Sequence, residues 1–261
     1  MNKKVLSIVN LLMAIIFVGW NTVSSSVGIN GNTVGSLSAE YLNLFTPAGY
    51  AFSIWGIIFL TQLGLAGFMM YRAFKPSASS DFISTLAPWL ICTNFFTSLW
   101  VLVWLLEWTG TSLIVMLIIL VSLLMIVVKL DLNTAKMSVA LRGWVSIPIQ
   151  IYTGWITVAT VANFSAYFAK LGWEGVPLNE IAWTIIMISI ATLANLLMLH
   201  YRKVYAYGFV GIWSLGAIAV RHSGAYPSLY YTALAGMVLI GLMILWRFIS
   251  GRIQKGALQT A

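Results

Sequence analysis

The stretch "TSLIVMLIILVSLLMIVVKL" occupies residues 111–130, and Lys129 is its only charged residue. Twenty residues of helix rise about 30 Å, which is the thickness of the hydrocarbon core of a bilayer. The whole chain has this character, because 61% of its 261 residues are hydrophobic and 8% are charged. A soluble domain carries about 25% charged residues. The sequence therefore predicts an all-α polytopic membrane protein.

Apolar stretches of similar length recur along the chain. We predict eight transmembrane helices, over residues 5–24, 47–71, 85–106, 111–130, 144–168, 180–200, 204–220 and 227–248. The first is too long and too aromatic for a signal peptide, so we expect it to be retained. The seventh is the shortest of the eight.

The charged residues predict how these helices are oriented. If the N-terminus is inside, twelve of the fourteen Lys and Arg residues are also inside, and only Lys170 and Arg221 are outside. Four of the six acidic residues fall outside: Glu40, Glu107, Glu174 and Glu180. Lys and Arg are enriched in cytoplasmic loops, so both termini are predicted to be cytoplasmic. The net charge of +8 then follows from topology and anionic lipid, and no nucleic-acid partner is expected.

Several kinds of chemistry are excluded by the positions of reactive residues. No Asp or Glu lies in the middle of a predicted span, which disfavours a proton-coupled pump. The two histidines, His200 and His222, are at span ends on opposite predicted sides, so they cannot share a metal or haem. Cys92 is the only cysteine, so no intrachain disulfide forms. We predict no catalytic residue, no cofactor and no metal site.

Tryptophan is the most informative residue type within the membrane. Trp20 lies near the outer end of the first span, and Trp55 lies about 12 Å below the outer start of the second. Trp100 and Trp104 share one face of the third span, because they are four residues apart. Trp155 is near mid-depth in the fifth span. These positions predict an aromatic cavity in the outer half of the membrane, with ordinary helix packing as the competing interpretation.

Two segments border this region on the outer side. The loop 25–46, with the run "SSVGINGNTVGS", is either a plain connector or a lid over the cavity. The stretch "LNLFTPAGYAFSIWGIIFL", residues 42–60, places Tyr50, Phe52 and Trp55 at the mouth of the second span. These aromatics belong either to an interfacial belt or to the rim of a ligand pocket.

Three motifs resemble those of the tryptophan-rich sensory protein/translocator protein (TspO/MBR) family. The stretch "YTGWITVATVANF", residues 152–164, is similar to the fifth helix of the family and shares its Tyr152, Trp155, Ala159, Thr160, Asn163 and Phe164. The second span resembles the family in Pro47, Tyr50, Phe52, Trp55 and Phe59, although one residue is missing between Phe52 and Trp55. The segment "CTNFFTSLWVLVW", residues 92–104, is similar through Asn94.

The resemblance implies a fold and a ligand class. Residues 1–170 are expected to form the family's five-helix bundle, with a pocket closed by the loop between its first two helices. Residues 171–261 would add three transmembrane helices and a short cytoplasmic tail, as an extended eight-helix relative. The ligand implied is a hydrophobic small molecule, either a tetrapyrrole such as a porphyrin or a sterol-like compound. A homo-oligomer in the lipid bilayer is compatible with this family.

Depth and resemblance together select ten candidate ligand-binding residues: Trp20, Tyr50, Phe52, Trp55, Asn94, Trp100, Trp104, Tyr152, Trp155 and Asn163. The function we predict is a membrane receptor, sensor or carrier for a flat hydrophobic ligand. The alternative is a secondary transporter of a neutral or amphipathic solute, although no internal repeat is evident. A tetrapyrrole-degrading enzyme ranks last, because the sequence offers no acid/base pair for it.

Overall fold

A computed structural model describes residues 2–41, 43–75, 79–132, 137–173 and 177–259, with side chains up to residue 250. Its helices are α1 (Lys3–Val27), α2 (Val34–Glu40), α3 (Ile54–Phe74), α4 (Asp81–Leu105), α5 (Thr109–Lys129), α6 (Val139–Leu141), α7 (Ile147–Lys170), α8 (Glu180–Arg202), α9 (Tyr205–His222) and α10 (Pro227–Gln259). A 3₁₀ turn, Gly49–Ser53, precedes α3, and a π-helical turn, Arg142–Ser146, joins α6 to α7.

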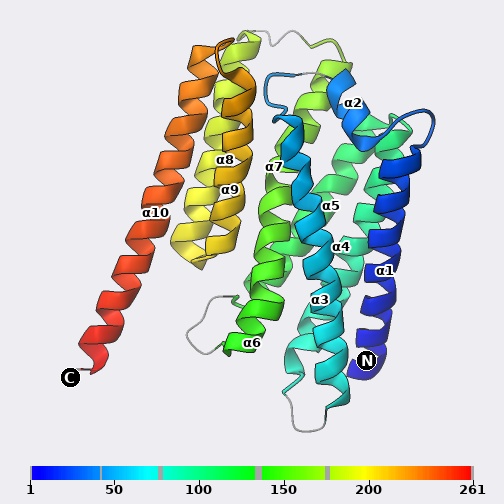
Figure 1. Cartoon of the computed structure of the whole chain (residues 1–261), viewed down its shortest axis with the longest axis vertical. Helices are drawn as coiled ribbons and strands as arrows, with labels where there is room; N and C mark the ends of the chain where they lie inside the picture. The colour runs from blue at the N-terminus through cyan, green and yellow to red at the C-terminus, as the bar shows by residue number, and fades with distance from the viewer. Residues whose placement is uncertain (1, 42, 76–78, 133–136, 174–176, 260–261) are drawn as a thin grey trace.

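Seven of the described helical segments are long and apolar enough to cross a membrane: α1, α3 with its 3₁₀ turn, α4, α5, the segment from α6 to α7, α8 and α10. The prediction of an all-α polytopic membrane protein is therefore confirmed. Helix α9, which corresponds to the predicted span 204–220, is not among the seven. It has 18 residues, which rise about 27 Å, and it ends in Arg221 and His222. It nevertheless lies alongside α8 and α10 in the same bundle (Figure 1).

Five long helices form a closed ring. Helix α1 contacts α3 and α4, α4 contacts α5, α5 contacts α7, and α7 contacts α3 to close the ring. Helices α8, α9 and α10 contact one another and form a second group beside α7 (Figure 1). Helix α7 therefore belongs to the ring and also carries the second group.

A glycine allows α9 to approach α7 closely. A Cβ atom at Gly154 would lie 3.0 Å from the Cβ of Val210 and 3.1 Å from the backbone oxygen of Tyr207. Because real Cβ atoms rarely come so close to backbone, any larger residue would push α9 away from α7. The two groups of helices are thus joined through a tightly packed contact, in which Tyr207 also donates to Thr157 Oγ1 at 2.9 Å.

The loop between the first two spans lies at one end of the bundle. Both chain termini lie at the opposite end, and α2 lies across the end that is far from them (Figure 1). The end with α2 also carries Lys170 and Arg221, the two cations that the charge pattern assigns to the outside. The assignment of that end to the extracytoplasmic side stays a prediction from the positive-inside rule.

Candidate ligand-binding site

Helix α2 is a seven-residue helix with its own capping interactions. Thr33 Oγ1 accepts the backbone N–H of Ser36 at 3.1 Å, and Ser36 Oγ accepts the backbone N–H of Thr33 at 2.8 Å. This reciprocal pair satisfies two donors that a helix start otherwise leaves free. Leu37 is fully buried and anchors α2 to the bundle below it. The loop 25–46 therefore contains an ordered helix.

A single carboxylate ties both ends of α2 to the ring. Glu107, in the turn between α4 and α5, accepts from Tyr41 Oη at 2.6 Å and from Asn32 Nδ2 at 3.2 Å. Asn32 precedes α2 and Tyr41 follows it. Lys170 Nζ lies 3.9 Å from Glu107 Oε2 and supports the carboxylate. We call Glu107, Asn32 and Tyr41 the carboxylate latch.

The latch shifts the pKa of both of its titratable members. The hydrogen bond from Tyr41 holds the pKa of Glu107 below its ordinary value of 4.5, against the opposing effect of burial, and Lys170 and Asn32 add to the lowering. Burial, followed by the hydrogen bond to Glu107, raises the pKa of Tyr41 to about 12. The contribution of Glu107 to folding stability is thus fully present above pH 4.5, its ordinary pKa. It is lost as pH falls through the lowered pKa of the folded protein. The contribution of Tyr41 to folding stability is fully present below pH 10.0, the ordinary pKa of tyrosine. It is lost as pH rises through the raised pKa of about 12.

Glu107→Gln is expected to loosen α2 at neutral pH, because a neutral amide accepts the Tyr41 and Asn32 hydrogen bonds less strongly than a carboxylate. The measurement is hydrogen–deuterium exchange of the amides of residues 33–41 in wild type and variant at the same pH. We expect faster exchange in the variant at pH 7, and equal exchange well below pH 4.5, where Glu107 is protonated in the wild type. Glu40→Gln, at an exposed position of α2, is the matched control. Equal exchange at pH 7 would show that Glu107 does not hold α2.

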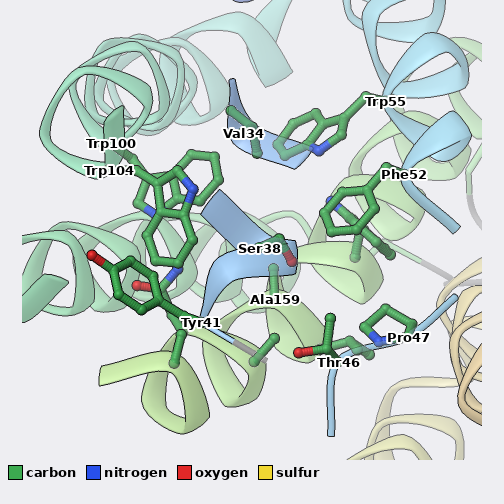
Figure 2. Close-up of a pocket in the computed structure, with 15 residues that line it drawn as sticks. Val34, Ser38, Tyr41, Thr46, Pro47, Phe52, Trp55, Trp100, Trp104 and Ala159 are labelled. Atoms are coloured by element: carbon green, nitrogen blue, oxygen red, sulfur yellow. The ribbon is translucent and has the colours of Figure 1, made fainter. Parts of the chain in front are cut away.

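Beneath α2 lies a cavity of about 50 Å³ with largely aromatic walls, here called the aromatic cavity. Figure 2 shows Trp100, Trp104 and Tyr41 on one side of it and Trp55 and Phe52 on the other, with Ser38 of α2 between them. Its lining residues are Val34, Ser38, Tyr41, Thr46, Pro47, Phe52, Trp55, Trp100, Trp104, Trp155, Val158, Ala159, Ala162, Asn163 and Ala166. The walls therefore come from α2, α3, α4 and α7 and from the segment between α2 and α3.

The indole rings of the walls have a definite arrangement. Trp100 and Trp104 stack with their centroids 6.0 Å apart and their planes 19° apart, which confirms the shared face predicted from their spacing. Trp55 continues the series, 6.4 Å from Trp100 at 23°. Trp155 stands nearly perpendicular to Trp55, at 6.3 Å and 83°. Three nearly parallel rings and one perpendicular ring suit a planar, apolar ligand.

Three of these indoles have buried N–H groups that lack an acceptor among the described residues: Trp100, Trp104 and Trp155. Their side chains are 5%, 4% and 2% exposed. An indole N–H can only donate, and an unpaired buried donor costs about 1–3 kcal/mol. A ligand with acceptor atoms would remove that cost. The cavity is therefore suited to a flat apolar ligand that carries hydrogen-bond acceptors at its edge.

Two further cavities adjoin the aromatic cavity. One of about 420 Å³ lies on the α1 side and includes Asn21, Ser25 and Thr33 in its lining. The other, of about 340 Å³, includes Arg221 and is here called the arginine cavity. Phe52 lines all three, so its half-buried ring borders each of them.

Six of the ten predicted site residues line the aromatic cavity: Phe52, Trp55, Trp100, Trp104, Trp155 and Asn163. Asn163 is oriented by Ser112, whose hydroxyl donates to Asn163 Oδ1 at 2.6 Å. Phe52 packs edge-on to Trp155 at 5.8 Å, so the cavity rim, not the lipid belt, accounts for Phe52 and Trp55. Trp55 lies in the first turn of α3, because the 3₁₀ turn before it replaces the helical start predicted at residue 47.

The other four predicted residues do not line the cavity. Trp20 donates its indole N–H to the backbone oxygen of Ser98 at 2.9 Å and joins α1 to α4. Tyr50 is 45% exposed and packs edge-on to Trp213 of α9 at 5.2 Å. The sequence pattern did not indicate the direction in which each of these side chains points.

Tyr152 and Asn94 lie deeper, inside the ring of helices. Tyr152 is fully buried behind Trp55, and its hydroxyl is 2.6 Å from Thr97 Oγ1. Asn94 is also fully buried, and its amide atoms have no partner among the described residues. Both residues therefore belong to the packed core of the five-helix ring and do not line the cavity.

Sequence reasoning missed Val34 and Ser38 of α2 and Tyr41 directly after it, because a seven-residue helix in a polar loop has no hydropathy signal. It also missed the small residues of α7: Ala159, Ala162 and Ala166. A signal for these existed. They follow Trp155 at intervals of four, three and four residues, which places all of them on one helix face. Small side chains there leave space in front of the indoles.

The fold and site define an integral multi-pass membrane protein whose helical bundle encloses an aromatic cavity beneath a short helix between the first two spans. The chain belongs to the TSPO-like protein family, since the family model of that description matches residues 7–246. The match runs from α1 into α10 and so includes the three C-terminal helices. It confirms the resemblance seen in the three motifs. Comparisons with curated proteins and with solved structures returned no match.

Proposed function

We propose that this protein is a membrane receptor, sensor or carrier for a flat hydrophobic ligand of the tetrapyrrole class, bound beneath α2 in the extracytoplasmic half of the bilayer. Membership of the TSPO-like family supports a ligand-binding or sensor role. The observation that carries the proposal is the aromatic cavity itself, whose four tryptophans include three with buried, unpartnered N–H groups.

A tetrapyrrole suits this site better than a sterol-like compound. A planar macrocycle can stack on the nearly parallel rings of Trp55, Trp100 and Trp104, whereas a sterol has no aromatic face to offer them. The carboxylates at the edge of a tetrapyrrole also supply several acceptor atoms for the indole N–H groups. A sterol hydroxyl supplies one acceptor atom.

Binding must be accompanied by opening of the site. Pockets that bind drug-sized molecules measure about 300–1,000 Å³. The aromatic cavity, at about 50 Å³, is in a closed form, and its neighbours of 420 and 340 Å³ provide the additional space. Displacement of α2, which Leu37 and the carboxylate latch hold to the ring, would join them.

The test is a titration of the protein in lipid nanodiscs with protoporphyrin, followed by tryptophan fluorescence and by the porphyrin absorbance band. We expect saturable quenching that excess cholesterol leaves in place. Absence of saturable binding would refute the proposal. The same protein is also reconstituted into liposomes. Porphyrin uptake into these liposomes at a higher rate than into protein-free vesicles would favour a carrier over a receptor.

A further inference from the structure

Arg221 lies at the C-terminal end of α9, outside the ring of five helices, yet it lines the arginine cavity. This cavity shares Ser38, Thr46, Pro47 and Phe52 with the aromatic cavity. A ligand that fills the aromatic cavity and reaches past Phe52 therefore meets the guanidinium group. No such role follows from the three motifs, because all of them lie before residue 165.

The guanidinium group has donors to spare. Arg221 Nη1 donates to the backbone oxygen of Thr46 at 2.7 Å. The ion pairs within the described parts of the chain are Lys3–Asp81 and Lys170–Glu107, and neither includes Arg221. Glu180 acts on Arg221 through space, but its carboxylate accepts the backbone N–H of Leu44 at 3.3 Å. A half-buried arginine that has no ion-pair partner among the described residues is suited to bind a ligand carboxylate through two parallel N–H donors.

Helix α9 holds Arg221 in a fixed position relative to the cavity rim. The backbone N–H of Ala48 donates to the oxygen of Ala217 at 3.1 Å, and Trp213 Nε1 donates to the oxygen of Ala51 at 3.2 Å. His222 Nε2 lies 2.7 Å from the oxygen of Leu44. Together with the Thr46 contact, these bonds fasten residues 44–51 to α9. The guanidinium group therefore does not need to be ordered when a ligand arrives, which favours binding.

The other outer cation is already engaged. Lys170 Nζ donates to the backbone oxygen of Glu107, faces its carboxylate, and lies 5.3 Å from the centre of the Tyr41 ring. Its charge is used to support the carboxylate latch. Arg221 is thus the cation that the described structure makes available to a ligand.

We propose that Arg221 binds a carboxylate of the ligand, so that the site selects flat hydrophobic acids over their neutral esters. This inference rests on the proposed function and names its ligand class more narrowly. It also assigns a role to the C-terminal helices, because α9 supplies the charged group that the five-helix ring lacks.

The experiment compares protoporphyrin, a dicarboxylic acid, with its dimethyl ester in nanodiscs of neutral lipid. We expect the wild type to bind the acid about 10- to 100-fold more tightly, the usual range for a charge-assisted contact that leaves a partner unpaired when it is removed. Arg221→Gln should bring the acid-to-ester affinity ratio close to one, and Arg221→Lys should restore part of it. Lys129→Gln, which removes an exposed cation at the far end of α5 from the carboxylate latch, should keep the ratio of the wild type.

The outcomes separate this inference from the proposed function. If the wild type binds acid and ester equally well, or if the preference survives in Arg221→Gln, Arg221 is not the carboxylate site and the proposed function still stands. If neither compound binds saturably, the proposed function fails and this inference fails with it. Equal thermal stability of the Arg221 variants and the wild type serves as the folding control.

Discussion

Ala159→Trp is expected to weaken protoporphyrin binding by up to about 100-fold, because overpacking of a filled site typically costs about 1–3 kcal/mol. Ala159 lies on α7 and lines the aromatic cavity, four residues after Trp155. An added indole is larger than the closed cavity of about 50 Å³ and would occupy the space in which a macrocycle lies. Binding is followed by the absorbance band of the porphyrin, which does not depend on the number of tryptophans.

The control must separate blocking from misfolding. Ile190→Trp adds the same side chain at a position of α8 that is 54% exposed and far from the cavity lining. Both variants should remain monodisperse and unfold cooperatively, and Ala159→Trp is expected to unfold at a somewhat lower temperature because its indole overpacks the closed cavity. If the Ala159 variant is stable and binds as well as the Ile190 variant, the ligand does not enter the aromatic cavity.

The second large effect is expected from Trp55→Phe combined with Trp155→Phe. Trp55 contacts five other aromatic rings, including those of Trp100 and Tyr152, so its loss reduces the stacking surface of the wall. Trp155→Phe also removes one of the buried N–H donors. Aromatic contacts and a hydrogen bond contribute about 1 kcal/mol each, which predicts about 30- to 100-fold weaker binding.

Phenylalanine at both positions keeps an aromatic ring in the core, so the helical ring should stay folded. Trp108→Phe is the matched control, because Trp108 is 58% exposed at the start of α5 and is not part of the cavity. Porphyrin affinity measured by absorbance should not change in the control. Wild-type affinity in the double variant would mean that the tryptophan wall packs the bundle and does not bind the ligand.

The sequence was sufficient for the fold class and for much of the wall. Segments such as 111–130 leave no alternative to membrane-spanning helices, and the spacing of Trp100 and Trp104 required a shared face. The family followed from three short motifs and was then matched over residues 7–246. Helix α9 was harder to judge, because its glycines and its terminal Arg221 and His222 dilute its hydropathy. The division of the chain at residue 170 stays a prediction, and α9 contributes to the core of the ring as well as to its own group.

The rest depended on directions that residue spacing cannot supply. Depth along a helix follows from counting residues, but the side to which a residue points depends on neighbours in other helices. Trp20 and Trp104 are both in the half of the bundle that carries α2, yet Trp20 donates a hydrogen bond to Ser98 while Trp104 lines the cavity. The carboxylate latch joins residues more than sixty positions apart, so no local pattern indicates it.

The central claim, that the ligand lies beneath α2, is tested most directly by protection of a cysteine at Ser38, which lines both the aromatic and the arginine cavities. In a Cys92→Ser background, the labelling rate of the thiol introduced by Ser38→Cys is measured with a small methanethiosulfonate reagent, with and without protoporphyrin. At ten times the Kd of the porphyrin, we expect labelling to slow by about tenfold. Ser26→Cys, at an exposed position near the end of α1, should be labelled at the same rate in both conditions. Bound porphyrin that leaves the labelling rate of Ser38→Cys unchanged would contradict the account.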